Sequence, residues 1–253
     1  MPPTAPKREL GQHFLVDENI LGVIGRLAEL APEDVVLEIG PGLGVLTRFL
    51  AARVAQVHAV EIDRSLASHL PETSNVTVHW GDALRLDLAG LGANKLVSNL
   101  PYNVATPIVV ESLDRLPGVE SWCVMVQREV ADRLFARPST KQYGAVSVLV
   151  QLATERTGFH AVSREVFRPR PNVESALVAF RRTELPAGWA RLKGVVEGAF
   201  AHRRKTLANS LSLAGIAERG AVVEALAALG RDPAVRAEAL APPEFVRLAE
   251  ALR

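Results

Sequence analysis

The sequence contains a single cysteine, Cys123, among 253 residues. An intrachain disulfide needs two cysteines, so a disulfide framework is excluded and a reducing compartment is expected. The six histidines are scattered without ligand spacing, and we therefore expect no metal site. No apolar run reaches the length of a membrane span, and the start of the chain has no apolar signal core. Together these absences favour a cytoplasmic protein without membrane contact.

An excess of one charge is missing as well. The net charge is +1, which gives no global argument for nucleic-acid binding. The distribution is uneven, because residues 1–180 carry 17 Lys and Arg against 20 Asp and Glu, whereas residues 181–253 carry 12 against 8. The basic excess gathers at Arg181–Arg182 and at Arg203–Lys205. Such a run is most often a solvated helix face, and the alternative is a contact with phosphates.

Strand-like and helical patterns alternate over most of the chain. The strand-like runs are 35–39, 57–61, 76–79, 95–98, 122–127 and 147–153, and a last run at 176–181 is placed to form a hairpin with the strand before it. Helical spacing occurs over 18–30, 107–116 and 128–136. The alternation predicts a doubly wound, Rossmann-like α/β sheet. After it come only amphipathic helical segments, so we expect a catalytic domain at 1–183 and a small all-helical domain at 184–253.

A glycine-rich turn follows the first strand-like run. Gly40, Gly42 and Gly44 come directly after it, and a helical pattern begins at Val45. The dinucleotide fingerprint requires a third glycine where this chain has Val45. The spacing instead lets the backbone approach an uncharged or zwitterionic nucleoside, which fits S-adenosylmethionine better than NAD.

Carboxylates end the next two strand-like runs. Glu61 follows Gly40 at about the distance at which a Rossmann acid meets ribose hydroxyls, and Asp82 is placed to accept a hydrogen bond from an adenine amino group. A single acid at a strand end is usually a helix N-cap. Functional residues at several successive strand ends favour a nucleoside site.

The turn Asn99–Tyr102 ends the fourth run. Asn99 offers a side-chain acceptor, Leu100 or Pro101 offers a backbone carbonyl, and the ring of Tyr102 offers a stacking face. Two acceptors that hold the protons of an exocyclic amine such as adenine N6 draw its nitrogen toward tetrahedral geometry. The turn therefore indicates methyl transfer to a base amine, the alternative being an ordinary strand cap.

These motifs, with several others, resemble the ribosomal RNA adenine dimethyltransferase family, in particular its small-subunit type. The resemblance covers nearly the whole chain and is carried by the segments 11–15, 38–44, 61–63, 81–83, 99–103, 167–175 and 203–211. It implies an S-adenosylmethionine-dependent enzyme, without a metal, that dimethylates two adjacent adenosines in the 3′-terminal hairpin loop of small-subunit rRNA. The implied partner is that rRNA within a pre-30S or 30S particle, bound by a monomer.

The resemblance also assigns residues. It implies that an N-terminal lid and the strand ends contact the methyl donor, with these residues in the site: His13, Leu15, Gly40, Gly42, Glu61, Ile62, Asp82, Ala83 and Asn99. The rings of Tyr102 and Phe167 are expected to sandwich the target adenine. Position 13 is often Asn in the family, so His13 departs from its pattern. Arg203, Arg204 and Lys205 are the expected RNA contacts, with Lys141 and Gln142 as weaker candidates.

Two other functions remain open. A related group of enzymes methylates a single large-subunit adenine and confers macrolide-class resistance, but Leu100, Asn103 and the 203–211 segment are closer to the small-subunit type. The second alternative is a non-catalytic RNA-binding assembly or transcription factor on the same fold. The intact Asn99–Tyr102 turn and the two carboxylates argue against a loss of chemistry.

Overall fold

The computed structural model describes residues 12–252, so Gly11, the first residue of the family resemblance, lies outside the described residues. The chain divides into two compact units. The first contains the described residues up to Ala131 together with Glu155–Arg182, and the second contains Asp132–Thr154 and the chain from Thr183 onward. Thus Asp132–Thr154, which we expected within the catalytic domain, belongs to the helical unit.

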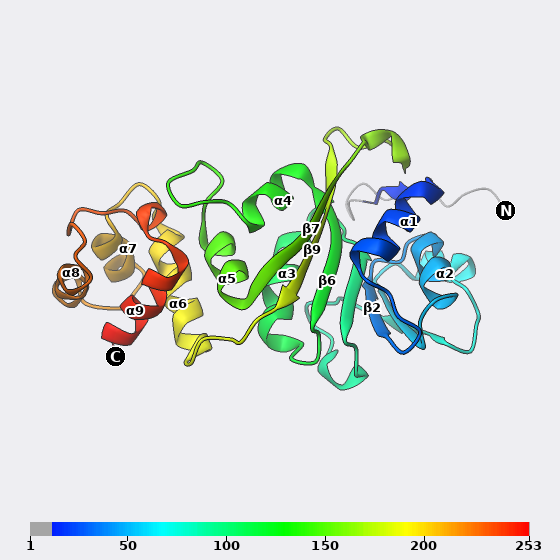
Figure 1. The fold of residues 1–253 in the computed structure, drawn as a ribbon, viewed down its shortest axis with the longest axis horizontal. Coiled ribbons are helices and arrows are strands. Elements are labelled where there is room, and N and C mark those ends of the chain that lie inside the picture. Colours follow the sequence, from blue (N-terminus) through cyan, green and yellow to red (C-terminus); the bar gives the residue numbers. More distant parts are fainter. Residues whose placement is uncertain (1–11, 253) are drawn as a thin grey trace. The chain divides into compact units, whose positions relative to one another are not determined.

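The first unit is built on a seven-stranded sheet (Figure 1). Its spatial order is β4 (Val76–Trp80), β3 (Gln56–Glu61), β2 (Val35–Ile39), β5 (Lys95–Asn99), β6 (Ser121–Gln127), β9 (Ser175–Arg182) and β7 (Thr154–Val162). The first five strands are parallel, and β9 is antiparallel to β6. The doubly wound sheet is confirmed. Because β3 lies on one side of β2 and β5 on the other, the strand order reverses between β2 and β5, which is where such sheets bind ligands.

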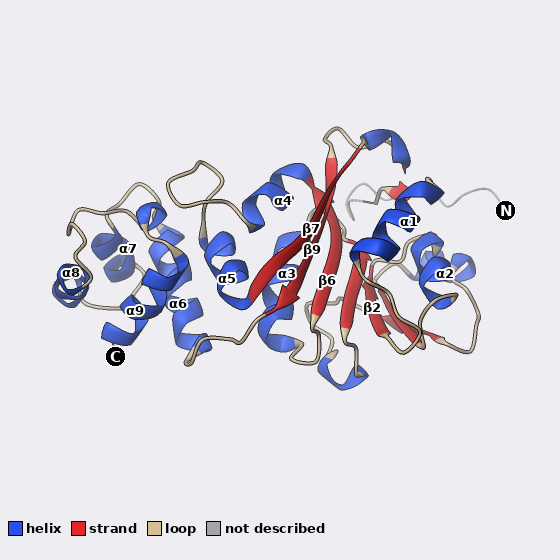
Figure 2. Cartoon of the chain, in the orientation of Figure 1, coloured by secondary structure: helices blue, strands red, loops and turns tan. Residues whose placement is uncertain are grey.

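Helices cover both faces of this sheet (Figure 2). They are α1 (Glu18–Leu27), α2 (Val45–Ala51) and α3 (Ala105–Arg115). The residues of α4 (Arg128–Leu134), which follows β6, are divided between the two units. Right-handed crossovers in opposite directions place α2 and α3 on opposite faces. The buried side of α1, with Ile20 and Ile24, packs with strand residues such as Val36 and Val57 in one apolar core. A separate two-stranded ladder pairs β1 (Phe14–Leu15) with β8 (Phe167–Arg168).

The second unit is helical. It contains α5 (Ala145–Ala153), α6 (Trp189–Ala201), α7 (Leu207–Leu213), α8 (Arg219–Ala228) and α9 (Pro242–Ala251). The strand expected at 147–153 is wrong, because this apolar run forms α5 and packs against α6 and α9. A short apolar run has no periodicity that separates a buried strand from a buried helix. Among the described residues, none of the helices in either unit combines the length and apolarity that crossing a bilayer requires.

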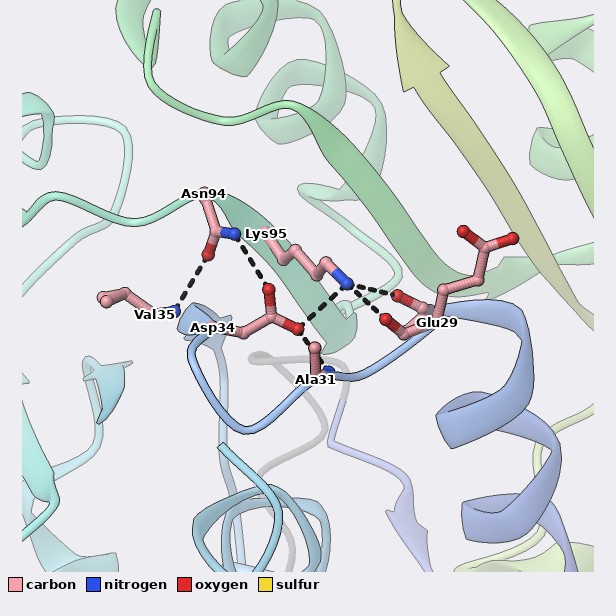
Figure 3. Close-up of polar contacts among 7 residues, drawn as sticks. Glu29, Ala31, Asp34, Val35, Asn94 and Lys95 are labelled. Carbon is pink, nitrogen blue, oxygen red and sulfur yellow. Dashed lines mark hydrogen bonds and ion pairs between the residues drawn. The ribbon is translucent and has the colours of Figure 1, made fainter. Parts of the chain in front are cut away.

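A polar network joins the amino ends of β2 and β5 to the end of α1 (Figure 3). Asn94 accepts a hydrogen bond from the Val35 N–H at 2.9 Å and donates to Asp34 at 2.8 Å. The Lys95 ammonium lies 2.9 Å from the Asp34 carboxylate and donates to the Ala28 carbonyl at 3.0 Å. Lys95 thus satisfies a carbonyl at the C-terminus of α1 that has no partner within the helix.

Candidate active site

A cavity of about 200 Å³ opens at the carboxyl ends of the parallel strands of the first unit. It lies at the point where the strand order reverses, as expected for a ligand site in a doubly wound sheet. All but one of the residues expected to contact the methyl donor or the target base line it: His13, Leu15, Gly40, Gly42, Glu61, Ile62, Asp82, Ala83, Asn99, Leu100, Pro101 and Tyr102. The exception is Phe167.

The glycine turn requires glycine for two reasons. Gly40 and Gly42 have φ angles of 74° and 58°, a region that side chains with a Cβ rarely adopt. A Cβ on Gly40 would also lie 3.0 Å from Pro101, and one on Gly42 would lie 3.0 Å from Phe14. The turn therefore lets both the Asn99–Tyr102 segment and the N-terminal segment approach the cavity.

Glu61 is held in place by backbone amides. Its carboxylate accepts hydrogen bonds from the Gly42 N–H at 3.2 Å and from the Asp63 N–H at 2.9 Å. The residue is 4% exposed, and burial raises its pKa above the ordinary value despite these hydrogen bonds. A carboxylate oxygen has two lone pairs, so each oxygen can accept a further hydrogen bond from a ligand hydroxyl.

Asp82 and Ile62 lie closer to solvent. The Asp82 side chain is 38% exposed, accepts from the Leu84 N–H at 3.0 Å and pairs with Arg85 at 3.4 Å. Ile62 is 55% exposed although it is apolar. An exposed apolar side chain beside a carboxylate suits the flat face and polar edge of a base.

Glu38 was missed by the sequence reasoning as a site residue. It lines the same cavity, is 1% exposed, and its Oε2 has no hydrogen-bond partner among the described residues. Burial raises its pKa to about 8, and the nearby Glu61 acts in the same direction. The available signal was an acid inside an otherwise apolar strand, where an unpaired charge is costly.

Asn99 presents an unpaired acceptor. Its amide nitrogen donates to the His13 carbonyl at 3.1 Å, which fixes the orientation of the side chain. Its Oδ1 is buried and has no partner among the described residues. Because an unsatisfied buried acceptor costs about 1–3 kcal/mol, such a group in a native protein calls for a ligand or another specific reason.

The ring that faces Tyr102 is not the expected one. Phe167 is fully buried in the apolar core, in the β-ladder opposite Leu15, and does not line the cavity. Moving it out of the core would cost about 1.5–3 kcal/mol. Instead the His13 ring lies against Tyr102, with centroids 5.2 Å apart and planes tilted by 30°. The Tyr102 hydroxyl hydrogen-bonds with the Ser175 hydroxyl.

Comparison with known proteins identifies the family. Residues 4–251 match the family described as ribosomal RNA adenine dimethylase. The chain belongs to this family. Relatives named ribosomal RNA small subunit methyltransferase A include that of Rubrobacter xylanophilus, 47% identical over 250 residues, which cover 96% of this chain and 94% of that one. The Streptomyces coelicolor relative of the same name is 44% identical, over 97% of this chain and 90% of its own.

Solved structures agree on the fold. A dimethyladenosine transferase from Plasmodium falciparum superposes with a TM-score of 0.78, over 93% of this chain and 96% of that one, at 23% identity. The 23S rRNA methyltransferase ErmE gives a TM-score of 0.67 over 94% and 99% of the two chains, at 31% identity. The chain is thus an rRNA adenine dimethyltransferase on a Rossmann-like methyltransferase fold.

The three basic residues expected to contact RNA differ in the contacts that they make within the protein. Arg203 donates to the Tyr143 carbonyl at 3.0 Å within the helical unit, whereas Arg204 and Lys205 are exposed and form no ion pair with any described residue. In the first unit, Arg182 donates to three backbone carbonyls, and its role there is structural. Arg204 and Lys205 therefore remain the better candidates for phosphate contacts.

Proposed function

We propose that this protein transfers methyl groups from S-adenosylmethionine to N6 of two adjacent adenosines in the 3′-terminal hairpin loop of small-subunit rRNA. The observation that carries the chemistry is that Asn99 lines the cavity and that its buried Oδ1 has no partner within the described part of the chain. The small-subunit target is supported by identities of 44–47% to relatives of that name, against 31% to ErmE. A pre-30S or 30S particle as substrate implies action in the cytoplasm.

The residues of the cavity fit the methyl donor. Glu61 offers a fixed carboxylate for the ribose hydroxyls, and Asp82 an acceptor for the adenine amino group beside the apolar Ile62. Glu38, whose buried Oε2 has no partner among the described residues, lines the same cavity. When bound there, S-adenosylmethionine supplies an electrophilic sulfonium methyl. The protein then has to position the amine in line with it and exclude water.

Asn99 orients the amine. Its Oδ1 accepts one N6 proton, and a backbone carbonyl accepts the other. The Pro101 carbonyl already accepts from the Val104 N–H at 3.1 Å, which favours the Leu100 carbonyl as the second acceptor. Held by both protons, the nitrogen directs its lone pair away from the two acceptors. Tyr102 supplies a stacking face for a base that has left its own stack, which a loop adenosine does at the lowest cost.

RNA docking is assigned to the helical unit and catalysis to the first unit. Arg204 and Lys205 are exposed cations that can neutralise phosphates. Replacing both with Gln should weaken binding to the particle and lower the slope of log K against log salt by about 1–2. Binding titrations at several salt concentrations measure this slope. An unchanged slope would mean that the pair is ordinary solvated surface in the turn between α6 and α7.

One experiment tests the function directly. The protein is incubated with radiolabelled S-adenosylmethionine and, separately, with small-subunit particles, large-subunit particles and the naked rRNAs, and the labelled nucleotides are then mapped. We expect dimethyladenosine at two adjacent positions of small-subunit rRNA. Label confined to one large-subunit adenine would assign the protein to the resistance-type group, and no label on any RNA would favour a non-catalytic factor.

A further inference from the structure

The ring of His13 contacts the ring of Tyr102, the residue expected to stack on the target base. The two planes are tilted by 30° and the centroids are 5.2 Å apart, within the range of 4.5–7 Å over which aromatic rings interact. Both residues line the cavity, so the Tyr102 face that His13 covers borders the space in which a target base must lie. A base cannot stack on that face while the imidazole occupies it.

Tyr102 is the fixed partner in this contact. Its hydroxyl hydrogen-bonds with Ser175 on β9, and its ring belongs to the turn that follows β5. A base that enters the cavity therefore meets a tyrosine whose position is already determined. For such a base to stack, the imidazole has to move.

The backbone of His13 is also fixed, but its ring is held weakly. The His13 carbonyl accepts from Asn99, and the next two residues pair with β8. With the described residues, the ring itself forms a hydrogen bond from Nδ1 to the Pro169 carbonyl at 2.9 Å. A carbonyl only accepts, so Nδ1 is the donor in this bond. Rotation about the side-chain bonds frees the ring while the backbone contact with Asn99 is kept.

We propose that the His13 imidazole is a placeholder for the target adenine: it covers the stacking face of Tyr102 in the free protein and rotates away when the base enters. This inference rests on the proposed function, because it takes Tyr102 as the base-stacking ring. His13 is then a positioning residue for RNA. Entry of a base costs the imidazole stack and one hydrogen bond. A purine recovers more of that cost than a pyrimidine does, since its ring system is larger, so the exchange favours adenine over cytosine.

A spectroscopic experiment tests the exchange itself. In protein with ¹³C-labelled histidine, the ring protons of His13 are assigned by their absence in His13→Ala. The ring current of Tyr102 should displace them from the free-histidine position, and Tyr102→Leu should abolish that displacement. Adenosine monophosphate is then added to the wild type together with S-adenosylhomocysteine. At an adenosine monophosphate concentration that inhibits methyl transfer, it should also abolish the displacement of the His13 signals. A His13 signal that stays displaced under that inhibition would overturn the proposal.

A kinetic experiment separates the ring from the backbone. His13→Ala removes the ring and should lower the KM for the RNA particle by about three- to tenfold, the factor that the stacking energy of one aromatic pair converts to. His13→Phe keeps a ring and should retain a KM near that of the wild type. His160→Ala replaces an exposed histidine on β7 that does not line the cavity and controls for loss of an imidazole. Equal KM values for the Ala and Phe variants, or a higher KM for Ala, would contradict the proposal.

The experiments distinguish a failure of this inference from a failure of the proposed function. If the wild type methylates its particle but the His13 variants behave alike and the His13 signal does not move, only the placeholder is wrong. If the wild type methylates no RNA, the proposed function is wrong, and with it the role of Tyr102. Melting temperatures of all variants establish that each one is folded.

Discussion

The two ends of the strands β2 and β5 carry similar polar residues with opposite consequences. At the amino ends, both oxygens of Asp34 and all three donors of Lys95 have partners. At the carboxyl ends, Glu38 and Asn99 each retain a buried oxygen without a partner among the described residues. Satisfied polar groups stabilise a fold, whereas unsatisfied ones cost stability and are tolerated where a ligand completes them.

The pKa values follow the same division. Burial alone would raise the pKa of Asp34, but the Ala31 amide and Lys95 outweigh it and hold this pKa below the ordinary value. At the other end burial prevails, and the pKa values of Glu38 and Glu61 are both raised. One end of the sheet therefore carries a paired charge, and the other end keeps unpaired groups available for a ligand.

The largest effect is expected from breaking the paired end. Lys95→Met keeps most of the side-chain volume but leaves the Asp34 charge buried without its cation, which should lower the free energy of unfolding by about 3–5 kcal/mol. Urea titration measures this loss, and the activity of the folded fraction should stay unchanged. The double variant with Asp34→Asn removes both charges and should recover part of the stability. A single variant as stable as the wild type would show that the pair contributes nothing.

The second prediction compares two asparagines that bracket β5. Asn99→Ala removes the acceptor that orients the amine and should slow single-turnover methyl transfer by about 10²-fold, since misplacing a reacting atom by 1 Å costs about that much. By contrast, Asn94→Ala leaves the Val35 N–H without its acceptor and should cost about 1–3 kcal/mol of stability with transfer unchanged.

Melting temperature and transfer rate are measured together for both variants. The Asn99 variant should also bind the donor more weakly, because this residue holds the N-terminal segment through the His13 carbonyl. A stable Asn99→Ala protein with full activity would refute the mechanism. Loss of activity in a stable Asn94→Ala protein would show that the two ends are not functionally distinct.

The third prediction concerns the donor. Glu61→Ala removes a charged acceptor and should weaken S-adenosylmethionine binding by about one to two decades, equivalent to 1.5–3 kcal/mol for a hydrogen bond to a charged group. Asp82→Asn should have a smaller effect, because its amide oxygen still accepts and the side chain is already partly exposed. Calorimetry on both folded variants gives the two affinities. Unchanged affinity in Glu61→Ala would exclude this carboxylate from the donor site.

Much of the carboxyl-end site was predictable because its signals are local and the strands are parallel. Gly40, Glu61, Asp82 and Asn99 each lie at or just beyond the end of a recognisable strand, and parallel strands bring their carboxyl ends to one edge. Their meeting in one cavity follows from this topology alone. The amino-end network offers no such signal, because Lys95 acts on carbonyls of a helix that is distant in sequence.

The features that sequence reasoning missed depend on tertiary packing. An apolar aromatic such as Phe167 suits a stacking site and a core equally well, and only its ladder with β1 decides for the core. The run 147–153 is apolar except for Ser147 and Gln151, and a run this short fits a strand as well as α5. β7 was not recognised because six of its nine residues are exposed, which is typical of a sheet edge.

The last prediction uses pH to separate the two ends. Glu38 keeps its proton in the folded protein up to about pH 8, whereas in the unfolded chain it ionises near 4.5. Between these values the folded state binds more protons, so this carboxyl should make stability fall as pH rises, with a limiting slope of about 1.4 kcal/mol per pH unit. Asp34 affects stability in the opposite direction, because its pKa is lowered in the folded protein. Its contribution to stability is present above the ordinary pKa of 3.8 and is lost in acid.

The variant Glu38→Gln isolates the contribution of Glu38 to the pH dependence of stability. The variant keeps the shape of the side chain without a titrating proton, so the stability difference between variant and wild type should grow with pH between about 5 and 8 and then level off. Glu61 and Arg48, the charged groups that act on Glu38, are present in both proteins and cancel in this difference. Urea titrations at several pH values, without methyl donor, measure it. A difference that does not change with pH would mean that Glu38 titrates as an ordinary carboxyl, and the division between the two ends of the sheet would then rest on Asn99 alone.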